Sequence, residues 1–258
     1  MRKKGFIIGI CVTLLVVTGI TGTAFYMKNI ENNEKQDRPV LTWIDDDTAN
    51  GLFENAYNIA KDLDIKMTFA AITDWLTQDS IKTLLLYQNE GFQIVSHSAT
   101  HDNKNIWGSN YEGTAVYDET LAEEDLKKSL STLKELGFKN YDYFVTPGAV
   151  EFAEVRELTK KYCKAMIEAQ FTSNINLEPV DPYDIHREFI SVTEHADAEY
   201  YKQLIDKACE ENAWLIFGTH SGIPEQWDED LIREVLQYAI DKGMAVETLD
   251  EGFKEKVG

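Results

Sequence analysis

Two histidines four residues apart, His97 and His101, are the side chains in this sequence best suited to hold a metal ion. On a helical turn this spacing would place both imidazoles on one face, at a separation that suits a single ion. The spacing alone is a weak signal, because the chain contains five histidines and one such pair can arise by chance. The position of the pair at the end of an apolar run strengthens the prediction of a metal site.

Three consecutive carboxylates, Asp45, Asp46 and Asp47, follow another apolar run. Like charges this close repel one another unless a cation or hydrogen-bond donors offset them. One aspartate could cap the helix that follows, which leaves the others to be explained. One aspartate together with His97 and His101 would leave open positions on a zinc-like ion, which is typical of a catalytic rather than a structural site.

A third histidine, His220, emerges after the apolar run at 214–218. If these runs are parallel strands, their ends share one edge of the sheet, where functional groups of such folds gather. A metal held there lowers the pKa of bound water to about 7 and polarises a carbonyl, and a neighbouring carboxylate can take the proton of that water. His220 could protonate the leaving group. The residues thus predict a hydrolase that forms no covalent intermediate.

Other reactive side chains are weaker candidates. His186 and His195 lie in a stretch that is predicted to be surface loop and short strand, so no metal role is assigned to them. Residues 218–222 are one position away from the spacing of a nucleophile elbow. Cys163 and Cys209 end no predicted strand, and two cysteines do not make a disulfide framework. They are predicted to be buried free thiols, with a single bridge as the alternative.

Strand-like and helix-like segments alternate along the chain and would position these groups. Strands are predicted at 40–44, 67–72, 92–96, 143–145, 165–167, 189–192, 214–218 and 244–248. Helices are predicted at 52–63, 80–90, around 126–133, and at 152–163, 198–211 and 229–241. This alternation indicates crossover units and a parallel sheet, and the number of strands suits a closed or nearly closed barrel. An open doubly wound sheet is the alternative.

The N-terminal segment differs in character from the rest of the chain. Arg2, Lys3 and Lys4 precede an apolar run from residue 5 to about 26, which ends at Lys28 and is long enough to span a bilayer. The run is longer than the core of a signal peptide and lacks a clear cleavage site, so an uncleaved anchor at 1–28 is favoured over a secreted protein. The basic flank keeps the N-terminus inside. We expect a polar linker at 29–38 and an extracytoplasmic domain at 39–258.

That domain is strongly acidic. Residues 31–258 hold all 45 acidic residues but only 21 of the 25 basic ones, which gives a difference of 21 − 45 = −24. Such a charge repels nucleic acid and other anionic polymers and favours a neutral or cationic ligand. No nucleic-acid partner is expected.

Four short motifs in chain order resemble those of the polysaccharide deacetylases, the family four carbohydrate esterases. The first motif of that family is an aspartate pair, and its match makes Asp46 the base and Asp47 a metal ligand, with Thr48 in place of the usual glycine. A register one residue earlier would select Asp45 and Asp46. The second motif matches residues 97–101 in full, so the resemblance implies that His97 and His101 complete the metal triad.

The remaining motifs match less completely. In the third motif the family has an arginine that orients the base, and Val145 stands there in this sequence, which leaves that role to Arg187 or another basic residue. The proline is kept as Pro147, so the resemblance implies that the N–H of Gly148 holds the oxyanion. The fourth motif is not recognisable, although residues 181–187 could cover that region. The histidine of the fifth motif matches His220.

The resemblance implies a distorted (β/α) barrel of seven or eight strands and a hydrolase that removes N- or O-linked acetyl groups from a cell-envelope or extracellular polysaccharide. It implies a divalent metal, Zn²⁺ first, with Co²⁺, Ni²⁺ or Mn²⁺ as alternatives, and the roles of base for Asp46 and acid for His220. The departures from the motifs leave open a catalytically impaired member of the same fold that binds glycan. An enzyme acting on a small non-peptide amide is a third possibility.

Overall fold

The computed structural model describes residues 38–48, 52–108, 116–148, 153–169, 174–193 and 195–258. The anchor predicted at 1–28 lies outside these ranges, as does nearly all of the linker. No helix in the described part of the chain is long and apolar enough to cross a membrane.

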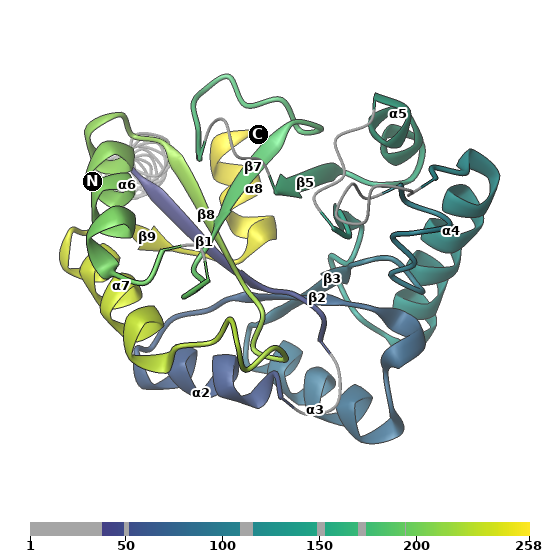
Figure 1. Cartoon of the computed structure of the whole chain (residues 1–258), viewed down its shortest axis with the longest axis horizontal. Helices are drawn as coiled ribbons and strands as arrows, with labels where there is room; N and C mark the ends of the chain where they lie inside the picture. Colours follow the sequence, from purple (N-terminus) through teal and green to yellow (C-terminus); the bar gives the residue numbers. More distant parts are fainter. Residues whose placement is uncertain (1–37, 49–51, 109–115, 149–152, 170–173, 194) are drawn as a thin grey trace, which may run out of the picture. The chain divides into compact units, whose positions relative to one another are not determined.

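Seven parallel strands form a ring at the centre of the fold (Figure 1). In order around the ring they are β1 (Val40–Asp45), β2 (Thr68–Ala71), β3 (Gln93–Ser96), β4 (Tyr143–Val145), β5 (Ala165–Ala169), β7 (Ile185–Phe189) and β8 (Trp214–Thr219). The ring is closed because β8 pairs with β1 over the whole length of both strands. The predicted barrel is therefore confirmed, and the open doubly wound sheet is excluded.

Two short strands complete the sheet where the parallel strands begin. β6 (Ile175–Asn176) runs antiparallel to the start of β8, and β9 (Ala245–Val246) runs parallel to the start of β1. The neighbours β7 and β2 pair with only the later parts of β8 and β1. The short strands therefore occupy edges that would otherwise leave backbone groups unpaired.

Helices surround the ring (Figure 1). They are α2 (Glu54–Asp62), α3 (Gln78–Asn89), α4 (Glu119–Leu136), α5 (Ala153–Tyr162), α6 (Ala198–Glu210) and α7 (Glu229–Asp241), with a single turn of 3₁₀ helix, η1 (Thr73–Trp75), after β2. Several begin at a side chain that accepts a backbone N–H, as Asp118, Asp197 and Asp228 do for α4, α6 and α7. Such caps fix where a helix begins.

A further helix, α8 (Leu249–Lys256), closes the end of the barrel at which the strands start. Its first residue, Leu249, packs inside the barrel with Val40 and Ile216. Asp250 accepts a hydrogen bond of 2.8 Å from the hydroxyl of Tyr143. The opposite end, where the strands finish, carries the predicted site residues.

Side chains along each strand alternate between the barrel interior and the layer beneath the helices. On β1, Val40 and Ile44 face the interior, whereas Leu41 and Trp43 pack outward against the helix layer. Because both layers are apolar, the strand sequences are continuous hydrophobic runs. They lack the alternation of polar and apolar residues that would show which side chains face the barrel interior.

Several elements differ from the sequence prediction. The strand expected at 189–192 lies at Ile185–Phe189, and β6 and α8 were not predicted. β7 has the sequence Ile-His-Arg-Glu-Phe, and its three polar residues do not resemble a buried strand. Arg187 and Glu188 are nevertheless buried. The strand expected at 244–248 shortens to Ala245–Val246 because α8 begins directly afterwards.

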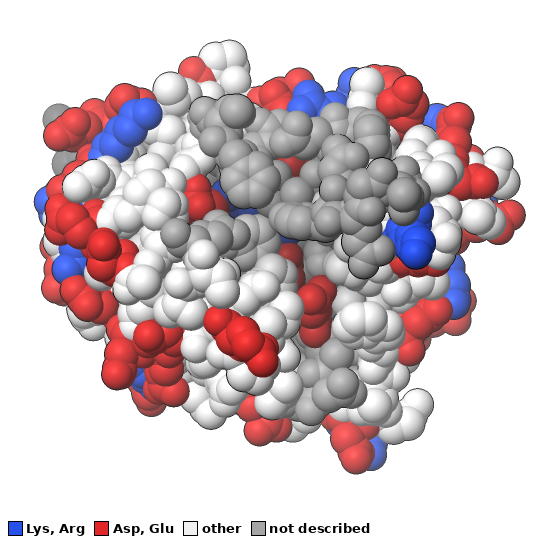
Figure 2. All heavy atoms as spheres, viewed as in Figure 1, with Lys and Arg blue, Asp and Glu red and all other residues white. Residues whose placement is uncertain are grey.

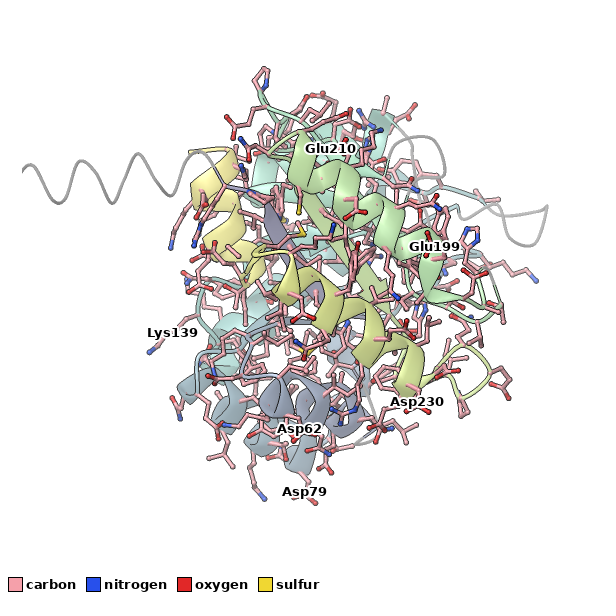
Figure 3. All side chains as sticks on the ribbon, turned by 90° about the vertical axis from the view of Figure 1, so that its left-hand side faces the viewer. Asp62, Asp79, Lys139, Glu199, Glu210 and Asp230 are labelled. Atoms are coloured by element: carbon pink, nitrogen blue, oxygen red, sulfur yellow. The ribbon has the colours of Figure 1, made fainter. Side chains whose placement is uncertain are left out.

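The negative charge is spread over the helices around the barrel. Carboxylates are dispersed around the rim of the face shown in Figure 2, with fewer basic side chains among them. Figure 3 shows that Asp62, Asp79, Glu199, Glu210 and Asp230 project outward from α2, α3, α6 and α7. Dispersed charge of this kind supports solubility and a general repulsion of polyanions, and it forms no single binding site.

Candidate active site

Asp46 follows β1 at the open end of the barrel and is 2% exposed. Its Oδ1 accepts a 2.7 Å hydrogen bond from Nη1 of Arg187, while Oδ2 lies 3.7 Å from Nε2 of His97 and 3.9 Å from Nε2 of His220. Burial alone would raise the pKa of Asp46, but the charges of Arg187 and His97 outweigh it and hold the pKa below its usual range. Asp46 is thus an ionised carboxylate with one oxygen fixed and the other between two imidazoles.

Asp47, His97 and His101 form a cluster in which one ligand atom from each lies within 4.8 Å of the others. Oδ1 of Asp47 is 3.3 Å from Nε2 of His97 and 3.5 Å from Nε2 of His101. The two imidazole rings have centroids 4.9 Å apart. One carboxylate and two imidazoles at these separations could hold one ion, with coordination positions left for water and substrate.

The chemistry of this cluster fits a cation. Although Oδ1 of Asp47 and Nε2 of His97 are close, they are not aligned as a hydrogen bond, and each of these buried atoms has no hydrogen-bond partner within the described part of the chain. Burial would raise the pKa of Asp47, but His97 and His101 hold it well below its usual range. Burial and the neighbouring charge of His97 lower the pKa of His101 to about 4. The cluster therefore offers an ionised carboxylate and a neutral imidazole, the forms that bind metal.

The tautomer of His97 is fixed by β4. Its Nδ1 lies 2.8 Å from the carbonyl oxygen of Val145, and because a carbonyl can only accept, Nδ1 carries the proton. In the neutral form of His97, which is the form that binds metal, the lone pair on Nε2 therefore faces Asp47. A backbone carbonyl that orients an imidazole in this way is typical of metal-binding histidines.

The His97 and His101 side chains meet through a loop, not through the helical turn predicted from their spacing. No helix spans this segment, and Ser98 and His101 have φ of 67° and 56°. The N–H of His101 donates to Oγ of Ser98 at 2.9 Å. The carboxylate of Asp125 on α4 accepts the N–H groups of Ala99 and Thr100 at 3.0 and 3.1 Å, which stabilises this conformation.

His220 follows β8, and its imidazole stacks on the ring of Phe189, with centroids 4.7 Å apart and planes within 4°. Its Nδ1 has no hydrogen-bond partner among the described residues. The guanidinium of Arg187 lies over the same ring of Phe189, 4.6 Å from its centroid. Phe189 therefore contacts both His220 and Arg187, the two side chains that flank Asp46 on this side.

The sequence of this chain is similar to that of a known protein family. The model of the polysaccharide deacetylase family matches residues 32–166, which is more than half of the chain. The chain belongs to the polysaccharide deacetylase family. No match was found among curated protein sequences.

Solved structures of similar fold share little sequence with this chain. A family 4 acetyl xylan esterase from Clostridium thermocellum, in complex with a cobalt ion, has 12% identity and a TM-score of 0.58, with 83% of this chain and 90% of that chain covered. A peptidoglycan N-acetylglucosamine deacetylase domain from Eubacterium rectale has 13% identity and a TM-score of 0.55, with 82% and 88% covered. A family 4 pseudoenzyme from Bacillus anthracis has 13% identity and a TM-score of 0.59, with 85% and 67% covered. These likenesses show the shared fold.

The geometry of the site distinguishes between the two possible registers of the aspartate motif. Asp46 and Asp47 face the imidazoles, whereas the carboxylate of Asp45 accepts hydrogen bonds from Thr219 and Ser221. Burial raises the pKa of Asp45 to about 7, against hydrogen bonds that lower it. The geometry favours the register in which Asp46 and Asp47 form the pair.

The arginine that the family motif places at the position of Val145 has a substitute in Arg187. Val145 lies among apolar residues of the barrel interior. Arg187 reaches Asp46 from β7, with its side chain only 1% exposed. A guanidinium is therefore bound to Asp46, but it comes from a different strand than the motif predicts.

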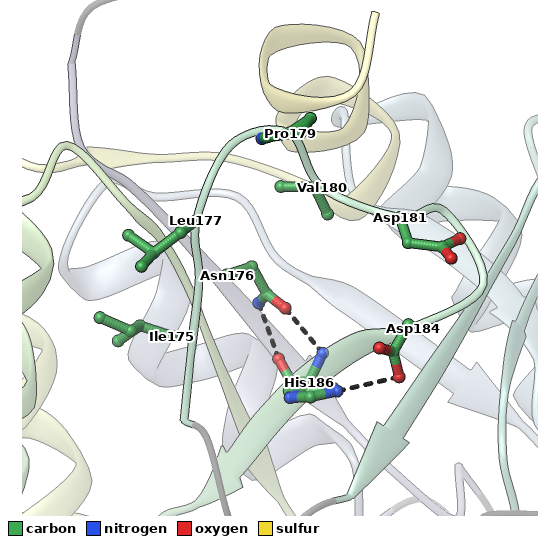
Figure 4. Close-up of a pocket in the computed structure, with 8 residues that line it drawn as sticks. All are labelled: Ile175, Asn176, Leu177, Pro179, Val180, Asp181, Asp184 and His186. Atoms are coloured by element: carbon green, nitrogen blue, oxygen red, sulfur yellow. Dashed lines mark hydrogen bonds and ion pairs between the residues drawn. The ribbon is translucent and has the colours of Figure 1, made fainter.

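The region that could cover the fourth motif, residues 181–187, reaches the site through Arg187. Gly148 follows β4 with a φ of 58°, and its role as oxyanion donor stays a prediction. Asp184 and His186 lie away from Asp46, in a pocket of about 250 Å³ beside β6, with 3.1 Å between Oδ1 and Nε2 (Figure 4).

The other candidate side chains also lie apart from the cluster. His195 stacks on Tyr200, with ring centroids 3.6 Å apart. Cys163 is buried and Cys209 half-buried, and both are free thiols. Three further residues around the site, Asp125, Phe189 and Ser221, could not be recognised from the sequence, because none of them belongs to a recognisable motif.

Proposed function

We propose that this chain is a metal-dependent carbohydrate deacetylase that cleaves an acetyl group from nitrogen or oxygen of a glycan. The observation that carries the proposal is the position of Asp46. One of its oxygens is fixed by Arg187, and the other lies within 4 Å of both His97 and His220. A base is thereby placed between a candidate metal ligand and a candidate acid.

Asp47, His97 and His101 would hold the metal. Zn²⁺ fits their donor set best, and Co²⁺, Ni²⁺ or Mn²⁺ are alternatives. When bound, a divalent ion supplies a Lewis acid and lowers the pKa of a coordinated water to about 7. His97 is held for this role by Val145, and Asp47 remains ionised beside it.

Asp46 and His220 would divide the proton transfers. Oδ2 of Asp46 accepts the proton of the attacking water, because Oδ1 is already occupied by Arg187. Nε2 of His220 donates a proton to the leaving amine or alkoxide as its bond to the acetyl carbon breaks. Water is consumed, and acetate and the free sugar group are released. We also propose that the N–H of Gly148 stabilises the oxyanion.

The exposed position of Trp75 supports the proposal that the substrate is a carbohydrate. Its side chain is 45% exposed, whereas Trp43, Trp107 and Trp214 are completely buried. Its ring centroid is 6.1 Å from that of His101. An exposed indole at the edge of a catalytic site is suited to the apolar face of a sugar ring.

Metal analysis combined with acetate release would test the proposal. The purified protein is expected to bind one equivalent of Zn²⁺ and to release acetate from acetylated chitooligosaccharide, peptidoglycan or acetylxylan. His97→Ala and Asp47→Ala should lose the metal and the activity, whereas His186→Ala, a histidine outside the cluster, should keep both. Equal metal content in all four proteins would refute the metal site, and no acetate release from any of these glycans would refute the activity.

A catalytically impaired glycan-binding protein is the second candidate. The absence of an arginine at Val145 and of the motif glycine at Thr48 favours it, and pseudoenzymes occur among proteins of this fold. The contact between Arg187 and Asp46 favours the enzyme instead. Wild type and Asp46→Asn with equal turnover and equal affinity for an acetylated glycan would establish the second candidate.

We further propose that the catalytic domain faces outward from the cell membrane, anchored by residues 1–28. The apolar run with its basic flank supports this location. Protease treatment of intact cells should degrade the domain while its N-terminal segment remains with the membrane fraction. Release of the whole protein into the medium would indicate a cleaved signal instead.

A further inference from the structure

Asp45 is a wholly buried carboxylate that has no assigned role in the proposed reaction. Its Oδ1 accepts hydrogen bonds from the hydroxyl of Thr219 at 2.7 Å and from the N–H of Ser221 at 2.9 Å. Its Oδ2 accepts one from the hydroxyl of Ser221 at 2.5 Å. Three donors thus converge on one carboxylate, and all three belong to the two residues that flank His220.

The closure of the barrel does not require these contacts. β1 and β8 are already joined by a continuous register from Val40 opposite Trp214 to Asp45 opposite Thr219. Beyond that pairing, the N–H of Asp46 donates to the carbonyl of Thr219 at 2.8 Å. The two hydrogen bonds from Ser221 lie past the end of this ladder, so they fix the backbone at His220 and not the seam between the strands.

His220 depends on such indirect support. Its Nδ1 has no hydrogen-bond partner among the described residues, so no carboxylate there orients the ring. The ring plane is set by stacking on Phe189. That stacking requires Gly218, because a Cβ at this position would lie 2.9 Å from the ring of Phe189. The carboxylate of Asp45 holds the backbone on both sides, and Phe189 holds the ring.

We propose that Asp45 is a positioning residue for His220, which keeps Nε2 of that imidazole at the free oxygen of Asp46. The inference rests on the proposed function, in which His220 is the acid. An amide has a single acceptor oxygen, so in Asp45→Asn the hydroxyl of Ser221 would face an NH₂ group in place of its acceptor, which weakens the attachment of the turn at Ser221. The expected defect lies in the step that uses His220 and not in metal or glycan binding.

A double-mutant cycle tests this coupling. Asp45→Asn should lower kcat about tenfold or more, with KM and zinc content within about twofold of wild type. In a His220→Ala background the same substitution should cause no further loss, because residues that act through one group are not additive. Asp45→Asn lowering kcat by the same factor in both backgrounds would overturn the proposal.

The matched control is Asp250→Asn at the closed end of the barrel. Asp250 is also a buried carboxylate, and it accepts hydrogen bonds from the side chains of Tyr143 and Asn140. The Asp250→Asn variant should lose thermal stability, while its kcat stays within about twofold of wild type. An equal fall in kcat for Asp45→Asn and Asp250→Asn would mean that general stability explains the effect, which would also overturn the proposal.

Histidine side-chain NMR separates this inference from the proposed activity. The ring signals of His220, assigned with His220→Ala, should shift or broaden in Asp45→Asn and remain unchanged in Asp250→Asn. An inactive wild type that still shows this pattern would refute the deacetylase and support the positioning role. Unchanged His220 signals in Asp45→Asn would refute the positioning role, whether or not the protein releases acetate.

Discussion

The two sides of the candidate site are built in different ways. On the side of β1 and β3, the aspartates and histidines stand in short runs directly after their strands, at residues 45–47 and 97–101. On the side of β7 and β8, the site takes single side chains, Arg187 and Phe189 from within one strand and His220 after the other. The metal-side groups therefore come from two short runs of sequence, whereas the groups around the acid are single side chains that the fold brings together.

The two sides differ because the first must coordinate a metal ion and the second must position the groups that transfer protons. The metal side needs ligands at fixed mutual distances, which a compact loop can supply once Asp125 holds its N–H groups. The acid side must orient a guanidinium and an imidazole about one carboxylate, and both of them contact the ring of Phe189. Substitutions on the first side are expected to remove the metal, and those on the second to retain it and slow turnover.

The largest effect is expected on the metal side. Asp47→Ala and His97→Ala should lower kcat/KM by roughly a thousandfold or more, because the Lewis acid is lost with its ligand. Zinc per chain, measured by atomic emission, should fall in parallel. A variant that loses activity but keeps a full equivalent of zinc would break the comparison, since its residue would then belong to the proton-transfer side.

A smaller loss is expected when Arg187 is changed to lysine. The ammonium keeps the charge beside Asp46 but not the planar donor geometry of the guanidinium, so Oδ1 of Asp46 would be poorly oriented. We expect kcat to fall by about a hundredfold and zinc content to stay near one equivalent. The lysine retains a partner for the buried carboxylate, whereas Arg187→Leu should lower the free energy of unfolding by about 3–5 kcal/mol. Chemical denaturation would measure that difference, and a fully active Arg187→Lys would contradict the positioning role.

The sequence predicts the metal side of the site more completely than the side of Arg187 and His220. The barrel was predictable from alternating strands and helices, and the cluster of Asp47, His97 and His101 from motifs at strand ends. The motif match favoured the register of Asp46 and Asp47 but left a shift of one residue open, because both faces of β1 are buried in apolar layers and such a shift reverses which side chains face inward. Only the pairing of β1 with β8 shows that Asp45 faces Thr219 and Asp46 faces the barrel interior.

Arg187 was one candidate for the base-orienting arginine, but its place within a strand could not be predicted, for a related reason. Its strand contains charged residues on consecutive positions, which normally indicates a loop, and the predicted strand was therefore placed at 189–192. Arg187 is buried because Asp46, which is 141 positions away in sequence, compensates its charge. The loop at 97–101 was likewise expected to be helical, since the left-handed conformations of Ser98 and His101 leave no mark in the spacing.

Gly218→Ala should produce an intermediate effect confined to the acid side. The added Cβ would lie 2.9 Å from Cε1 of Phe189, so the ring must tilt and carry the imidazole of His220 with it. We expect kcat to fall by several-fold to about tenfold, with about 1–3 kcal/mol lost in the free energy of unfolding from overpacking. Steady-state kinetics and thermal denaturation would separate the two. A kcat equal to that of wild type would show that stacking on Phe189 does not control His220.

The smallest expected effect lies at Trp75, outside both sets of reacting groups. The turn of η1 is fastened to the histidine loop, because the N–H of Thr73 donates to the carbonyl of Ser98 at 3.3 Å and that of Asp74 to the carbonyl of Ala99 at 3.0 Å. The indole is thereby held beside His101, with 6.1 Å between the ring centroids.

Trp75→Ala should therefore raise KM for an acetylated glycan about fivefold, the loss of roughly 1 kcal/mol of stacking, and leave kcat nearly unchanged. Trp75→Tyr should recover most of the affinity, and hydrolysis of a small aryl acetate should be unaffected in both variants. Leu86→Ala, which removes another exposed apolar side chain from α3, is the matched control and should change neither constant. A defect of equal size on the small ester would place Trp75 in the support of the metal loop instead of in sugar binding.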